Sequence, residues 1–219
     1  MTELQIGGMQ VLREAALERA RHYLTVGRGW AYPSYDGFDS AHAYGPLVDG
    51  DLLAPVLLNV RQMSITTYEQ LRGALPRLQE LLDRIPERVS LATAGTAELD
   101  LIGELFGVVD NKAIWGAQGT VLSKVLHRKR PDFIPLYDPR VGAVYQQGAG
   151  APVPVVKRRP WREFAPLFAA AVQVDLRREA AFWQEIAALA PGPPITPLRA
   201  SRCPPLWAPG CCWCPRRGR

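Results

Sequence analysis

The stretch from Gly116 to Tyr145, GAQGTVLSKVLHRKRPDFIPLYDPRVGAVY, constrains the fold more than any other part of the sequence. A glycine turn opens it, and a short basic helix is expected over 120–129. Arg130-Pro131 ends that helix, because the residue before a proline avoids helical backbone. Asp138-Pro139 then pairs a strong N-cap with a proline at the first helical position. The stretch therefore predicts two short helices with a crossing between them.

The rest of the chain also has helical periodicity, with apolar residues recurring three and four positions apart. No run of alternating strands and no internal repeat is visible. The chain is long enough for one sizeable core. We therefore predict a mostly α, single helical domain over residues 1–190. The expected helices, read from caps, prolines and glycines, cover 9–23, 49–60 (interrupted by Pro55), 67–84 (kinked or divided by Pro76), 96–107 and 160–190.

Residues 191–219 differ in composition from the rest of the chain. They contain eight prolines, all four cysteines and no acidic residue. We predict a disordered tail, and we hypothesise that the native reading frame was lost near residue 195. Cys211 and Cys214 form a C-x-x-C pair, but zinc sites usually need a second pair of ligands. No metal or cofactor is expected.

The formal charge of +5 comes from the tail, because residues 1–190 hold 21 basic and 21 acidic side chains. Within this neutral body, residues 111–162 hold 10 basic and 2 acidic side chains, whereas residues 1–110 hold 9 and 15. This segregation indicates either an electropositive surface or an internal interface between the two parts. No segment has the ~18 apolar residues of a membrane span, and no signal peptide is visible. The expected location is the cytoplasm.

The basic side chains of the expected helix over 120–129 are candidates for nucleic-acid contacts. Lys124, His127 and Arg128 share one helix face by their spacing. Glycines in the preceding turn allow a phosphate backbone to approach the exposed N–H groups. The candidate phosphate-binding residues are Gly116, Gly119, Lys124, His127, Arg128, Lys129 and Arg130.

Asp138 has two possible roles. Its carboxylate caps a helix, and this alone accounts for the Asp-Pro pair. The same geometry also holds a carboxylate beside a basic helix, where it could act on an electron-poor sugar carbon during glycosidic bond cleavage. Lys124 fits a phosphate contact or a solvated charge better than a nucleophile.

Two segments, YDGFDSAHAYGPLVDGDLLAPVLLNV and TVLSKVLHRKRPDFIPLYDPRVGAVY, resemble an uncharacterised bacterial family of unknown function over residues 30–185. The order of hairpin, helix and PLYDPRV also resembles the core of helix-hairpin-helix DNA glycosylases, whose catalytic Asp matches Asp138. Bifunctional members carry a Lys at the end of the hairpin, where this chain has Gly119 and Thr120. The resemblance therefore implies a monofunctional glycosylase or a non-catalytic relative.

Taken together, these features predict a nucleic-acid-binding protein whose partner is double-stranded DNA, and the glycosylase resemblance implies a role in base excision. Asp138 would be catalytic in that case. The aromatic loop over 27–46 is either a cover on the core or a lid facing a ligand. As a lid, it would offer Trp30, Tyr32 or Tyr35 to stack on an extruded base. The alternative is a non-catalytic interaction protein whose basic face binds an acidic partner.

Overall fold

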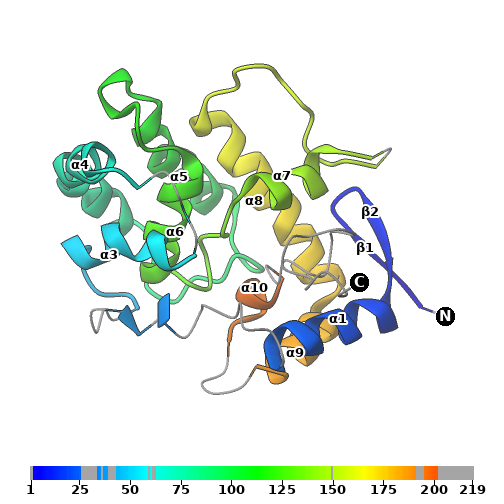
Figure 1. The fold of residues 1–219 in the computed structure, drawn as a ribbon. Coiled ribbons are helices and arrows are strands. Elements are labelled where there is room, and N and C mark those ends of the chain that lie inside the picture. The colour runs from blue at the N-terminus through cyan, green and yellow to red at the C-terminus, as the bar shows by residue number, and fades with distance from the viewer. Residues whose placement is uncertain are drawn as a thin grey trace, which may run out of the picture.

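The computed structural model describes residues 2–25, 34–35, 37–38, 43–58, 60, 63–148, 150–190 and 195–201. These residues form a mostly helical fold, as predicted, with one small antiparallel sheet (Figure 1). Among them, none of the helices combines the length and the apolar composition that a membrane span requires. The predicted tryptophan and tyrosine positions Trp30 and Tyr32 lie outside the described residues.

The N-terminus forms a β-hairpin that the sequence reading missed. β1 (Glu3–Ile6) pairs antiparallel with β2 (Met9–Leu12), and α1 (Arg13–Thr25) follows directly. The prediction of a helix from residue 9 is therefore wrong for its first four residues. Gly7 adopts a positive φ of 54° in the two-residue loop, a conformation that suits glycine and permits a tight hairpin.

The second part of the fold begins with α3 (Asp49–Leu53), which a 3-10 turn over 54–58 prolongs. Pro55 thus interrupts the helix, as predicted. α4 (Ile65–Asp83) starts at its N-cap Ser64, whose hydroxyl accepts from the Thr67 amide, so the predicted start at residue 67 is slightly late. Pro76 lies inside α4 without dividing it.

α5 (Thr96–Gly107) packs against α8 (Trp161–Arg178), and the two helices lie side by side in Figure 1. Two short 3-10 turns follow α5, over Val108–Asp110 and Lys112–Ile114. Asp110 caps α8, because its carboxylate accepts from the amides of Trp161 and Arg162 at 2.7 and 2.8 Å. The predicted helix over 160–190 is divided in two, with α9 (Ala180–Ala188) starting after Glu179.

α6 (Gly119–Lys129) and α7 (Pro139–Gln146) have the limits that the sequence predicted to within a residue or two. α6 is the central helix, because every residue from 121 to 130 is buried. One hydrophobic core extends around it, from Leu4 in the hairpin to Ala200. A helix buried on all sides has no solvated face. The charged side chains of α6 are therefore positioned to bind groups inside the protein.

A last short helix, α10 (Pro197–Ala200), lies within the predicted disordered tail. Leu198 and Ala200 are buried in the common core, and α10 lies beside α9 (Figure 1). Thr196 caps the helix by accepting from the Arg199 amide. The prediction that disorder begins at residue 191 is therefore wrong for residues 195–201. Burial of these apolar side chains holds them in place.

Candidate functional site

Arg128 and Lys129, two of the predicted phosphate contacts, form buried ion pairs with Asp51 of α3. Arg128 Nε lies 2.9 Å from Asp51 Oδ1, and Lys129 Nζ lies 2.8 Å from Oδ2. All three side chains are at most 3% exposed. These cations therefore compensate an internal carboxylate and hold α6 against α3.

The other guanidinium nitrogens of Arg128 bind the aromatic segment around residues 35–38. Nη1 donates to the carbonyl of Tyr35 and Nη2 to that of Phe38. Tyr35 is fully buried, and its hydroxyl donates to the carbonyl of Lys124. Its ring cannot reach a base in this position. The described part of the aromatic loop is thus a cover on the core rather than a lid.

His127 is also in the interior. Its Nδ1 lies 2.6 Å from the carbonyl oxygen of Ile134, and Arg199 Nε of α10 donates to its Nε2 at 2.8 Å. His127 is completely buried and Arg199 is 4% exposed. Neither ring nitrogen faces solvent.

Arg130 stabilises the end of α4. Its guanidinium donates to the carbonyl of Leu82, in the last turn of that helix, and to the carbonyl of Lys129. A cation at a helix C-terminus is favourable because the terminal carbonyls are electronegative. Burial lowers the pKa of Arg130, and the carboxylates of Asp83 and Glu87 counteract this effect.

The two glycines of the predicted phosphate turn are explained by internal packing. The Gly116 amide donates to Gln70 Oε1 at 3.0 Å, so it is not offered to an external phosphate. A Cβ on Gly116 would lie 2.8 Å from Thr67 Oγ1. A Cβ on Gly119 would come closer than 3.0 Å to the ring of Trp161. The glycines thus permit close contacts with α4 and α8, and they form no phosphate turn in this structure.

Asp138 is the N-cap of α7, as predicted. Its Oδ1 accepts from the amides of Arg140 and Val141 at 2.8 and 2.9 Å. Oδ2 accepts no hydrogen bond from the described residues, and the side chain is half-buried. Asp138 therefore caps the helix with one oxygen and retains the other for a different contact.

Lys124 extends from α6 towards the segment that precedes Asp138. Its ammonium donates to the carbonyls of Thr120 and Tyr137, both at 3.2 Å. Burial lowers the pKa of Lys124 from 10.5 to about 8, although the nearby Asp138 carboxylate raises it. Ser123 binds the same peptide, because its hydroxyl accepts from the Tyr137 amide at 3.1 Å. The Lys124 amine, whose pKa is lowered, thus lies near the Asp138 carboxylate. Lys124 and Ser123 together hold the Tyr137 peptide that precedes Asp138.

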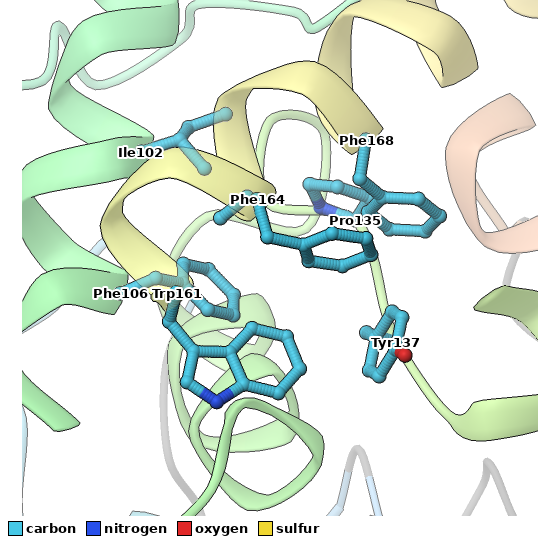
Figure 2. A pocket seen from close by; sticks show the side chains of 8 residues that line it. Ile102, Phe106, Pro135, Tyr137, Trp161, Phe164 and Phe168 are labelled. Carbon is cyan, nitrogen blue, oxygen red and sulfur yellow. The ribbon is translucent and has the colours of Figure 1, made fainter. Parts of the chain in front are cut away.

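Tyr137, whose carbonyl binds Lys124 and which directly precedes Asp138, lines an aromatic cleft. Figure 2 shows its ring among those of the cleft. The Tyr137 ring lies edge-on to the rings of Trp161, Phe164 and Phe168, with centroid distances of 5.1 to 5.3 Å. Burial raises the pKa of Tyr137, and Asp138 raises it further. The rings pack so closely that the space between them has no room for a water molecule, whereas ligand pockets usually begin at ~300 Å³. The full lining is Ile102, Phe106, Pro135, Tyr137, Trp161, Phe164, Ala165 and Phe168.

The first turns of three helices meet at this cleft. α6 begins at Gly119 against Trp161, α7 begins beside Tyr137, and Trp161 is the first residue of α8. Four exposed cations lie close in sequence to the first residues of α7 and α8. They are Arg140, Lys157, Arg158 and Arg162. Sequence reasoning missed the cleft because its rings come from three parts of the chain that are far apart in sequence, at Phe106, Tyr137 and the first turns of α8.

Comparison with known protein families assigns the chain to one family. A family described as "Family of unknown function (DUF6308)" matches residues 16–202. The chain belongs to this family. The DUF6308 match includes α10, which argues against a change of reading frame as early as residue 195. No curated protein and no solved structure matches the chain.

Among the described residues, no group of three or more His, Cys, Asp or Glu side chains could hold a metal ion. The candidate site of this DUF6308 protein therefore consists of Lys124, Asp138 and the rings around Tyr137. It differs from the site predicted from sequence in its cations, which now come from the surface around α7 and α8.

Proposed function

We propose that this DUF6308 protein binds nucleic acid and acts on it by base-excision chemistry at the junction of α6, α7 and α8. The observation that carries the proposal is the position of Lys124 and Asp138 beside an aromatic cleft, where the Asp138 carboxylate counteracts the effect of burial on the pKa of Lys124. Perturbed titratable groups at a cleft are typical of functional sites. Aromatic rings at such a place suit a nucleobase, because every base has a face that can stack.

In this proposal Asp138 is the catalytic carboxylate. Its Oδ2, which accepts no hydrogen bond from the described residues, would stabilise an oxocarbenium-like sugar or orient a water. The Lys124 ammonium lies near enough for the Asp138 carboxylate to raise the pKa of Lys124. Ser123 and Lys124 both bind the Tyr137 peptide, so they also position the residue before Asp138.

The base would stack against Tyr137 and Trp161, which are half-buried and so keep part of their rings open. Their rings already contact one another, and the small empty volume leaves no space between them. Entry of a base therefore requires one ring to rotate. Phosphate contacts are assigned to the exposed Arg140, Lys157, Arg158 and Arg162, because the cations of α6 are buried.

The alternative is a non-catalytic protein whose basic face binds an acidic partner. The sequence analysis assigned that face to α6, but the cations of α6 are buried. The exposed cations around α7 and α8 could still bind an acidic protein. A test must therefore distinguish binding of nucleic acid from binding of any polyanion.

The test uses the full-length chain and a duplex with or without an abasic-site analogue, over a series of salt concentrations. Wild-type protein should prefer the lesion, and Arg162→Gln should weaken binding and reduce the salt slope by about 1. Arg19→Gln, an exposed change on the distant α1, is the matched control. Equal binding to both duplexes and to heparin would contradict the proposal. Asp138→Asn should retain binding and lose any base release.

A further inference from the structure

The outward face of α8 is apolar, whereas the exposed face of a helix in a soluble protein is normally polar. From residue 164 to residue 176, the side chains that are not buried are Pro166, Leu167, Ala170 and Val174. Leu167 is 45% exposed and Val174 is 53% exposed. Spacings of three and four residues place Leu167, Ala170 and Val174 in one stripe along the helix. A continuous apolar stripe of this kind indicates a surface that another molecule covers.

The two ends of this stripe carry opposite charges. Glu163 precedes the stripe and Arg177 follows it, and both side chains are exposed. Each lies seven residues from Ala170, which is nearly two helical turns, so the three residues are almost in line. Arg177 Nε donates to the carbonyl of Ala92, and this bond holds the guanidinium beside the stripe. Glu163 forms no ion pair with a described residue.

We propose that the stripe is the contact between two copies of this chain, which pack α8 against α8 in antiparallel orientation about a two-fold axis at Ala170. This proposal is independent of the proposed function. The axis brings Leu167 against Val174 of the second copy. It also brings Glu163 against Arg177 of the second copy, ~10 Å along the helix from the axis. Each of these pairs occurs twice, as a two-fold interface requires.

The charges at the two ends favour a second copy in this orientation over other occupants. A parallel pair of α8 helices would place Glu163 against Glu163 and Arg177 against Arg177, and like charges repel. A partner of one charge would complement a single end of the stripe, whereas a second copy complements both. The small Ala170 side chain at the axis lets the two helices approach closely.

The contact is small, which limits its strength. α8 has 18 residues, and one stripe of this length covers less than the ~800 Å² per partner of a standard stable interface. We therefore expect a weak dimer with a Kd of about 10–1000 μM.

Sedimentation equilibrium of the full-length chain tests the dimer, over concentrations from about 5 to 1000 μM that span the expected Kd. A reductant is present, because the cysteines at 203, 211, 212 and 214 could cross-link two copies. The average mass of the wild type should rise from that of one chain towards that of two. A wild type that stays monomeric at every concentration would overturn the proposal and leave the stripe to a partner of another kind.

Charge reversal tests the antiparallel arrangement. Glu163→Arg and Arg177→Glu should each raise the Kd by about tenfold or more, because each places like charges opposite one another at both ends. An equimolar mixture of the two variants should dimerise again, since opposite charges then face each other in the mixed dimer. Both side chains are exposed, so the fold should tolerate either change.

The matched controls are Glu18→Arg and Arg19→Glu, which are exposed changes on α1 and should dimerise as the wild type does. Either of two results would refute the proposed contact. The first is a wild-type Kd for Glu163→Arg and Arg177→Glu, and the second is a mixture of these variants that stays monomeric.

Discussion

Replacing Lys124 by Met should stabilise the protein at pH 7. The pKa of Lys124 is lowered from 10.5 to about 8, chiefly because burial disfavours the charged amine. That difference corresponds to about 3 kcal/mol of destabilisation when the folded protein keeps the amine protonated. Met loses the two hydrogen bonds to carbonyls, which removes about 1 kcal/mol of the gain. The free energy of unfolding should therefore rise by about 2 kcal/mol.

The gain in stability from Lys124→Met should decrease as the pH rises. Below pH 8 the amine is protonated in both the folded and the unfolded chain, so the destabilisation is constant. Between pH 8 and 10.5 the unfolded chain holds the proton and the folded protein releases it, so wild-type stability rises with pH through this group. The advantage of Lys124→Met should shrink over this range and reverse before its upper end, where the variant should be about 1 kcal/mol less stable than the wild type.

Urea unfolding of the wild type and Lys124→Met at several pH values between 7 and 10.5 measures this difference. Lys112→Met is the control, because Lys112 is exposed and its loss should change the free energy of unfolding by less than about 0.5 kcal/mol. A less stable Lys124→Met at pH 7, or a difference that stays constant with pH, would refute the reasoning. Either result would mean that burial of the charged Lys124 amine does not lower the free energy of unfolding.

Three further predictions concern the packing around the site. Gly119→Ala should lower the free energy of unfolding by about 1–3 kcal/mol, because its Cβ meets the Trp161 ring, whereas Gly73→Ala in open space on α4 should raise it by about 0.5–1 kcal/mol. Asp51→Asn removes the carboxylate shared by Arg128 and Lys129, and thermal or urea unfolding should show a loss of about 3–5 kcal/mol. Asp138→Ala should lose about 1 kcal/mol of capping energy and Asp138→Asn almost none; equal losses in urea would contradict the capping role.

The helices around Asp138 could be predicted because their signals are local. An Asp-Pro pair caps a helix, and Arg-Pro ends one, without regard to the rest of the fold. The hairpin at Gly7 was missed because its strands are only four residues long. The Gly7-Gly8 pair was the local signal for this hairpin, because two glycines suit a two-residue loop.

The surroundings of α6 could not be predicted from its sequence. Helical spacing shows that Lys124, His127 and Arg128 share a face, but it does not show what that face meets. Its partners are Asp51 of α3, the carbonyls of Tyr35 and Phe38, and Arg199 of α10, all distant in the chain. The charge segregation between the two parts of the chain is in part internal compensation, which was one of the two interpretations that the sequence allowed.

The central claim is that the aromatic cleft beside Asp138 receives a nucleobase. Fluorescence of a 2-aminopurine placed opposite or next to an abasic-site analogue tests it most directly, with wild-type protein and Trp161→Ala compared at low salt. The proposal predicts that wild-type protein unstacks the probe from the duplex and quenches it against the cleft, and that Trp161→Ala binds without this change. Binding that leaves the probe stacked in both proteins, or no binding of the wild type, would contradict it.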